Sequence, residues 1–376
     1  MRRGVLSALI AIIVIIRVVL FPHLASPQAA HVLGPAKVPA CNVAATTASP
    51  TISATPGMHG TTPVPAGSAR LQHLADIPLP GYTSRFDYQN LDSTTGRLYI
   101  SHMDAGQLVV FDTTTQTVTG TVDDLPTVTG VLVVPELHRV FAAVAGDHQV
   151  AVIDTRDLRV IARLGTIGFP DGLAYAPQTR QVFVSDESGG GEVVIDAVTN
   201  QVVTTIDIGG EAGNTHYDAG SGCIVVAVQT QNQLVVVDPT TDQVVGKYEV
   251  KNGCQSPHGF LIDAPHRLAF VTCEDNATLL VVELTTMQVT ATLATGDRPD
   301  VLAFDPGLNM LYVASEAGVV FIFDARGGTL DPVGDYRAPH AHSVAVDPAT
   351  HLVYLPLEDI DGQPVLRILA PPNPGS

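Results

Sequence analysis

Acidic and imidazole side chains recur at two fixed positions of a repeating sequence unit. The first position lies about five residues before the Asp or Pro that ends the first strand expected in each unit. Asp or His fills it at Asp87, Asp171, His258, Asp300 and His342, and the other two units have Gly130 and Gly213 there. The second lies four residues after the aromatic position of the next strand and carries Glu187, Gln229, Glu274, Glu316 and Glu358. Clustered carboxylates and imidazoles perturb one another's pKa unless a positive group binds among them. The two positions therefore predict an acidic surface that suits a cation, a metal ion or a basic ligand.

A metal site is one form that this chemistry could take. His258, His342 and Asp300 are the candidate metal ligands, and Asn214 is a further candidate for ligand binding. Calcium would be held by carboxylate and amide oxygens, whereas copper would favour the histidines. No HxH, HExxH or CxxC spacing fixes the geometry of a site, so calcium, copper and no metal at all stay open as alternatives.

The same residue types also have structural uses. Asp, His and Gly at the start of a strand can cap turn amides, and glutamates on loops often form a solvated rim. A catalytic nucleophile is not indicated, because the sequence has no GxSxG motif and no pattern of Ser, His and Asp. The residues therefore favour binding over catalysis, and the presence of an enzymatic activity stays open.

The elements that must position these residues come from a repeat of 41 to 45 residues. A Val- and Ile-rich strand that ends in an acidic residue recurs at Asp112, Asp154, Asp196, Asp238, Glu283 and Asp324, and a last copy without the acid lies at 365–369. Seven units of short β-branched strands, separated by Gly, Pro, Asp and Thr turns, are typical of an all-β, seven-bladed propeller with four strands per blade. In the third unit we expect strands at 172–175, 181–185, 192–196 and 201–208.

The boundaries of the first and last repeat units predict how the ring closes. The last unit ends after its third strand, and an extra strand at 71–79 precedes the first unit. We therefore expect the N-terminal strand to complete the last blade, which leaves only short, protected sheet edges. The loops that lead into the first strands and those between the second and third strands should open on one face, around the central channel. Both acidic positions should lie on that channel face, where function usually resides.

The repeating unit resembles the YVTN-repeat, or YncE-like, propellers that bacteria export. The resemblance rests on the second-strand motifs LYIS at 98–101, VFVS at 182–185 and LYVA at 311–314, and on SVAVDPATH at 343–351, and it covers about residues 70 to 370. It implies an extracytoplasmic binding or scaffolding module. The same broad superfamily holds the nitrous-oxide reductase and methylamine-dehydrogenase propellers, and neighbouring propellers include calcium-dependent lactonases.

Those relatives supply two alternatives to a non-enzymatic module that binds a small ligand or a protein. A metal-dependent hydrolase of the lactonase type would hold a divalent ion with Glu187, Asp300 and Asn214. A metal or redox accessory protein of a respiratory enzyme would bind copper through His258, His340 and His342. The binding module is the first choice, because no unit carries an insertion long enough to form a lid over a catalytic site.

The N-terminal region predicts export. Two arginines precede an apolar run at 5–21, which is typical of a signal peptide, and the length of the run also allows an uncleaved signal anchor. We expect a signal peptide or anchor at 1–25, a disordered Pro/Ala/Thr-rich stalk at 26–69, the propeller at 70–371 and a tail at 372–376. The protein would be periplasmic, secreted or tethered, with membrane contact only through an uncleaved N-terminal segment.

The four cysteines divide into a predicted pair and two predicted free thiols. Cys254 and Cys273 fall in one blade and near one face, so we expect a disulfide there, consistent with export. Cys223 aligns with the apolar position of Leu268 and is expected to be a buried free thiol, and Cys41 is expected to be unpaired in the stalk.

Composition argues against some classes of partner and some classes of propeller. The formal net charge of −18 argues against nucleic acid, because an acidic surface repels phosphates. The absence of Trp argues against WD-repeat and pyrroloquinoline-quinone propellers, whose repeat motifs depend on tryptophan. No feature of the sequence indicates an oligomer, so a monomer is expected.

Overall fold

The computed structural model describes Cys41, residues 71–250 and residues 253–371. The predicted signal segment, the rest of the predicted stalk and the predicted tail lie outside these described residues. Within the described part of the chain, no helix is long and apolar enough to cross a membrane.

The described chain folds into seven four-stranded antiparallel sheets, as predicted. The inner strands are β2 (Gln89–Asp92), β6 (Val128–Val134), β10 (Pro170–Ala176), β14 (Ala212–Asp218), β18 (Pro257–Asp263), β22 (Pro299–Asp305) and β26 (Ala345–Asp347). The second strands are β3 (Arg97–His102), β7 (Arg139–Val144), β11 (Gln181–Asp186), β15 (Cys223–Val228), β19 (Leu268–Cys273), β23 (Met310–Ser315) and β27 (Leu352–Ile360).

The third and outer strands complete each blade. The third strands are β4 (Gln107–Asp112), β8 (Gln149–Asp154), β12 (Gly191–Asp196), β16 (Gln233–Asp238), β20 (Thr278–Glu283), β24 (Val319–Asp324) and β28 (Gln363–Ala370). The outer strands are β5 (Thr117–Val122), β9 (Val160–Leu164), β13 (Gln201–Asp207), β17 (Gln243–Glu249), β21 (Gln288–Ala294), β25 (Asp331–Arg337) and β1 (Gln72–Pro78). Short 3-10 turns are η1 (Pro135–Leu137), η2 (Ala145–Asp147), η3 (Glu274–Asn276) and η4 (Arg326–Gly328).

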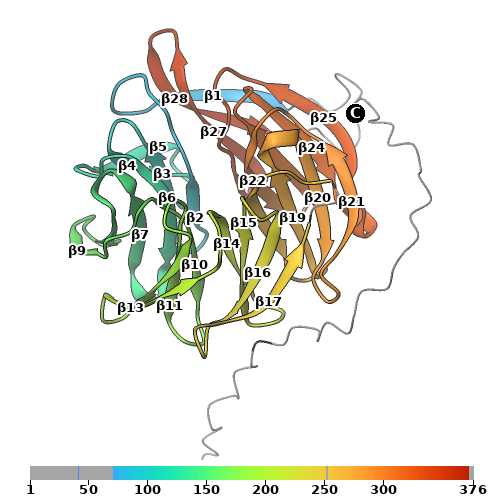
Figure 1. Cartoon of the computed structure of the whole chain (residues 1–376). Helices are drawn as coiled ribbons and strands as arrows, with labels where there is room; N and C mark the ends of the chain where they lie inside the picture. The colour runs from blue at the N-terminus through green and yellow to red at the C-terminus, as the bar shows by residue number, and fades with distance from the viewer. Residues whose placement is uncertain (1–40, 42–70, 251–252, 372–376) are drawn as a thin grey trace, which may run out of the picture. The chain divides into compact units, whose positions relative to one another are not determined.

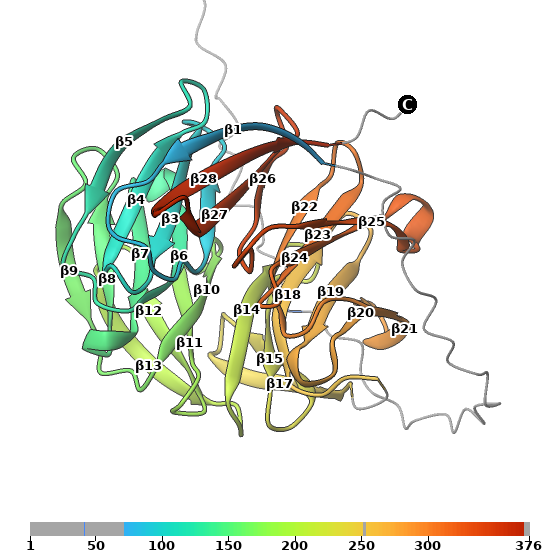
Figure 2. The same ribbon diagram turned by 90° about the horizontal axis from the view of Figure 1, so that it is seen from above.

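The blades form a closed ring around a central channel (Figures 1 and 2). Each inner strand contacts the inner strand of the next blade, and β26 of the last blade contacts β2 of the first. The N-terminal strand β1 pairs antiparallel with β28, so the sheet order of the last blade is β1-β28-β27-β26. The two strands lie side by side, β1 in blue and β28 in red (Figure 2). The predicted closure of the ring by the N-terminal strand is therefore confirmed.

The acidic residue that ends the third strands is a turn-capping device. The Asp112 carboxylate accepts hydrogen bonds from the backbone N–H groups of Thr114 and Thr115 at 2.9 and 2.8 Å, and Asp196 and Glu283 cap their own turns in the same way. Such side-chain caps satisfy amides that the tight turn leaves unpaired. The residue type that made the repeat visible thus fixes the hairpin between the third and outer strands.

The hydrophobic core is divided among the interfaces between adjacent blades. Seven clusters of buried apolar residues each join two neighbouring sheets, including the interface where the last blade meets the first. There Tyr354 of β27 and Phe111 of β4 pack edge to face with their ring centroids 6.0 Å apart. Because every blade buries two faces, the nearly continuous apolar runs of the second and third strands are accounted for.

The cysteines form two disulfides. The predicted bond between Cys254 and Cys273 is confirmed, and it joins the segment before β18 to the end of β19. The expectation of two free thiols was wrong, because Cys41 and Cys223 are bonded to each other. Cys223 is buried at the start of β15, and its apolar surroundings agree with the predicted position but not with the predicted redox state.

Removing the Cys254–Cys273 bond is expected to lower the free energy of unfolding by about 3 kcal/mol. The bond closes a loop with a sequence separation of 19, and the chain entropy of a loop of that length gives this figure. Urea unfolding of a Cys254→Ala/Cys273→Ala variant would measure the loss. The fully reduced wild-type protein and the fully reduced variant should then differ by less than about 1 kcal/mol. An unchanged midpoint in the oxidised variant would show that the bond does not constrain the unfolded chain.

Candidate functional site

The predicted site residues on the inner strands sit in a repeated β-bulge. In β10 the register shifts between Pro170 and Leu173, and the same shift occurs in β6, β14, β18 and β22. A bulge breaks the pleat and turns a side chain away from the sheet. The first bulged residue and its register equivalents in the first and last blades form what we call the channel ring: Asp87, Thr129, Asp171, Gly213, His258, Asp300 and His342.

The channel ring contains all five Asp and His residues that the repeat singled out. Each of them is buried, which a solvated loop residue would not be. One assignment needs correction, because the register places Thr129 and not Gly130 in the ring of the second blade. The Thr129 hydroxyl donates a hydrogen bond of 2.8 Å to the Pro170 carbonyl of the next blade.

The second residue of the bulge is glycine in three blades, at Gly130, Gly172 and Gly259. A β-carbon at Gly130 or Gly259 would collide with the backbone carbonyl of the neighbouring inner strand, so only glycine fits there. The equivalent residue in the first blade is Tyr88, and in the fourth blade it is Asn214. Sequence reasoning missed Tyr88. An aromatic residue in a column of mostly small residues was the available signal.

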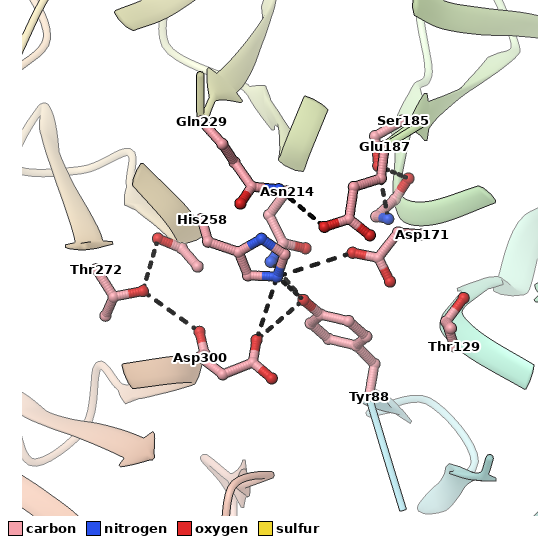
Figure 3. A network of polar contacts seen from close by, with 12 residues as sticks. Tyr88, Thr129, Asp171, Ser185, Glu187, Asn214, Gln229, His258, Thr272 and Asp300 are labelled. Carbon is pink, nitrogen blue, oxygen red and sulfur yellow. Dashed lines mark hydrogen bonds and ion pairs between the residues drawn. The ribbon is translucent and has the colours of Figure 1, made fainter. Parts of the chain in front are cut away.

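Tyr88 reaches across the channel and connects three other blades (Figure 3). Its hydroxyl accepts a hydrogen bond from Asn214 Nδ2 at 2.6 Å, lies 3.2 Å from His258 Nε2 and donates to Asp300 Oδ1 at 3.2 Å. One hydroxyl thus has both lone pairs and its proton engaged. Burial and the nearby carboxylates of Asp171 and Asp300 raise the pKa of Tyr88, so it stays protonated.

His258 and Asp300 form a buried ion pair at the centre of this network. The His258 Nε2 lies 3.5 Å from Asp300 Oδ1 and 4.0 Å from Asp171 Oδ2. Burial alone would lower the pKa of His258, but its contact with Asp300 and the charge of Glu274 raise that pKa well above its ordinary value. Burial likewise opposes ionisation of Asp300, yet the contact with His258 holds the pKa of Asp300 below its usual value. The pair is therefore charged at neutral pH.

Asp87, Asp171 and Glu274 make no ion pair with a lysine or an arginine among the described residues. Burial, together with the charges of Asp171 and Asp300, raises the pKa of Asp87 well above its ordinary value. Burial raises the pKa of Asp171 to about 7, with the negative charge of Glu187 adding to the effect. Burial also raises the pKa of Glu274. These shifts mean that positive charge in the channel would be bound favourably.

The second predicted set of acidic residues lies beside the ring. The backbone N–H of Glu187 donates to the Phe169 carbonyl at 2.9 Å, and the equivalent bonds start from Gln229, Glu274 and Glu316. Each bond ties the loop after a second strand to the loop that leads into the inner strand of the same blade. Glu187 accepts a hydrogen bond of 2.9 Å from Gln229 Nε2, so part of this rim is already paired.

Two other rim carboxylates have basic partners. Arg85 pairs with Glu316 at 2.7 Å and Arg298 with the same carboxylate at 3.6 Å. Both arginines thus make their ion pairs with Glu316 and not with an aspartate of the channel ring. Glu358 lies 3.5 Å from His340 Nδ1.

Two groups of side chains in the described part of the chain could each hold a metal ion. Asp87, Asp300 and His342 form one group, and His258, Glu274 and Asp300 form the other. Within each group the potential ligand atoms lie within 4.8 Å of one another. The predicted metal residues His258, His342 and Asp300 are therefore divided between two groups that share Asp300. Glu187 belongs to neither.

A cavity of about 210 Å³ lies in the channel next to Tyr88 and Asn214. Its other lining residues, such as Thr215, His216 and Phe260, follow the ring residues along the inner strands, so the cavity is deeper in the channel. Burial lowers the pKa of His216 to about 4, so this histidine is neutral at physiological pH. None of the residues that line this cavity is acidic.

Comparison with known proteins identifies the fold and nothing finer. No protein-family model matches the sequence, and no curated protein matches it. The structure is similar to a chain of hydrazine synthase from Kuenenia stuttgartiensis, with a TM-score of 0.65 and 18% sequence identity over 78% of this chain and 97% of that chain. At that identity the similarity establishes a shared β-propeller scaffold.

Proposed function

We propose that the protein is an exported, YncE-like propeller that acts as a non-enzymatic binding module and holds a positively charged ligand at its acidic channel face. The observation that carries the proposal is the charge imbalance of the channel. Two buried aspartates and four rim glutamates surround a single buried ion pair, and the nearest arginine is already paired with Glu316. A cationic small molecule, a metal ion or a basic segment of a partner protein would supply the missing charge.

Two further observations support export. Both disulfides fit a protein that folds in an oxidising compartment, because cytosolic thiols are kept reduced. The basic and apolar start of the sequence agrees with such a destination. The repeat motif at the second strands supports assignment to the YncE-like propellers.

The two alternatives have less support from the geometry. The divalent ion of a lactonase-type site would need Glu187 and Asn214 as ligands. Glu187 is already hydrogen-bonded to Gln229, and Asn214 is hydrogen-bonded to Tyr88. A copper site would need several histidines together, but His258 and His342 fall in different ligand groups. Ester hydrolysis that stops on chelation would nevertheless favour the hydrolase.

The charge imbalance predicts saturable binding of cations that depends on Asp300. Calorimetric titration at low ionic strength would use four probes: a lysine-rich peptide, Ca²⁺, Zn²⁺ and Mn²⁺. We expect at least one probe to bind, and we expect Asp300→Asn to weaken its binding tenfold or more, because Asp300 lies at the centre of both ligand groups. Asp331→Asn, an exposed carboxylate on the outer strand β25, is the matched control and should bind as the wild type does. Equal affinity of the Asp300→Asn variant would contradict the proposal.

A further inference from the structure

We propose that Asp87, Asp300 and His342 form a site for one divalent first-row transition-metal ion, at the seam where the last blade meets the first. This inference rests on the proposed function, because it specifies the cation and the place at which the acidic channel holds it.

The three ligands are brought together by the propeller's own symmetry. Asp300 comes from the sixth blade, His342 from the seventh and Asp87 from the first, and each occupies the channel-ring position of its blade. Their exposed fractions are 4%, 2% and 5%. Neighbouring inner strands in the same register thus aim two carboxylates and one imidazole at one point, with ligand atoms within 4.8 Å of one another. Equivalent positions in the second and fourth blades hold Thr129 and Gly213, so no such group arises there.

An independent observation indicates that something is missing beside His342. Its Nε2 is buried and finds no hydrogen-bond partner in the part of the chain that the structure describes. Buried imidazole nitrogens are normally satisfied, because an unpaired buried polar atom has lost its hydration without gaining a hydrogen bond. A bound ion would satisfy this nitrogen.

The second ligand group is less suited to an ion. His258 Nε2 already faces the Tyr88 hydroxyl and the carboxylates of Asp300 and Asp171. An ion bound through this nitrogen would have to displace those contacts, whereas no hydrogen bond of His342 Nε2 has to be broken.

The donor set selects the class of metal. Two carboxylates and one imidazole suit a divalent transition-metal ion such as Zn²⁺ or Mn²⁺, whereas Ca²⁺ prefers a shell of six to eight oxygens. The donor set therefore disfavours Ca²⁺, one of the two metals that the sequence suggested. Binding would also connect β22, β26 and β2, the inner strands on either side of the ring closure, so it should stabilise the fold.

The test is metal titration of the full chain after removal of bound metal with a chelator and dialysis. Calorimetry with Zn²⁺ and Mn²⁺, and elemental analysis by mass spectrometry, should show one ion per chain and a melting temperature that rises with metal concentration. Asp87→Asn and His342→Gln should each weaken binding by tenfold or more. Glu274→Gln is the matched control, because it removes a carboxylate from the other group only and should change the affinity less than threefold.

A second measurement needs no substitution at the site. Paramagnetic Mn²⁺ added to the wild-type protein should broaden the imidazole NMR signals of His342 before those of exposed His340, so a folding defect in a variant does not remove the test.

Each result has a distinct meaning. Binding that survives Asp87→Asn and His342→Gln but is lost in Glu274→Gln would overturn this inference and leave the proposed function standing. Binding of a lysine-rich peptide without any metal would do the same. Failure of every cationic probe would overturn both the metal site and the proposed function.

Discussion

Replacing Cys41 with alanine is expected to lower the free energy of unfolding by about 5 kcal/mol. The disulfide between Cys41 and Cys223 spans a sequence separation of 182, so it removes far more conformational freedom from the unfolded chain than a short-range bond does. In the folded protein Cys41 is partly buried and lies against the Val237 carbonyl of β16, where it packs with the core between the fourth and fifth blades. Equilibrium unfolding in urea measures the loss.

The Cys254–Cys273 bond is the natural comparison for this experiment. Its shorter separation of 19 gives an expected loss of about 3 kcal/mol, so the two variants should rank by the length of the loop that each bond closes. In excess reductant the wild type and Cys41→Ala should unfold at nearly the same urea concentration. A Cys41→Ala protein as stable as the oxidised wild type would mean that this bond leaves the unfolded ensemble unconstrained.

The architecture of the propeller was readable from the sequence because its determinants repeat. The acidic residue at the end of most third strands caps a turn. Because the same hairpin geometry recurs, the same residue type recurs at positions such as Asp112 and Asp196. Ring closure could be predicted because the last unit lacks a fourth strand and the sequence before the first unit supplies one. The repeat and the ring closure could both be inferred from local patterns and from the number of strands in each unit, and a single sequence is enough for both.

The contents of the channel were only partly readable, because a β-bulge inserts one residue into each inner strand. Counting from the strand end assigned Gly130 where the register places Thr129. The role of Tyr88 depends on its contacts with Asn214, His258 and Asp300 in three other blades, and the spacing of the repeat does not report contacts across the channel. Cys41 was missed because it lies in a Pro/Ala/Thr-rich segment with no apolar periodicity, so nothing nearby indicated contact with β15 or β16.

Glu192 is a further residue whose buried environment could not be predicted from the sequence. It lies near the start of β12 with an exposed fraction of 0%, and neither carboxylate oxygen has a hydrogen-bond partner among the described residues. The register gives Leu108, Leu234 and Leu279 as its equivalents in other blades. Burial raises the pKa of Glu192 from 4.5 to about 8. The folded protein therefore holds this carboxyl protonated at neutral pH.

The raised pKa makes the fold less stable as pH rises. Between pH 4.5 and about 8 the unfolded chain releases the proton of Glu192 while the folded chain retains it, so ionisation favours the unfolded state. The stability contributed by the protonated form is complete below pH 4.5 and is lost as pH rises toward 8. The full difference amounts to about 4 to 5 kcal/mol, on the scale of 1.36 kcal/mol per pKa unit.

Substitution of Glu192 separates this pH-dependent cost from the cost of burying a polar group. We expect Glu192→Gln to be more stable than the wild type at pH 8 and nearly equal to it at pH 4.5, because glutamine carries no proton to lose. Glu192→Leu, which copies the equivalents in other blades, should be more stable than the wild type at both pH values, because it also removes the unpaired polar atoms. Urea unfolding at pH 4.5, 6, 7 and 8 gives the three curves. If all three proteins lose stability in parallel between pH 4.5 and 8, Glu192 does not titrate between the folded and unfolded states, and another group sets the pH dependence.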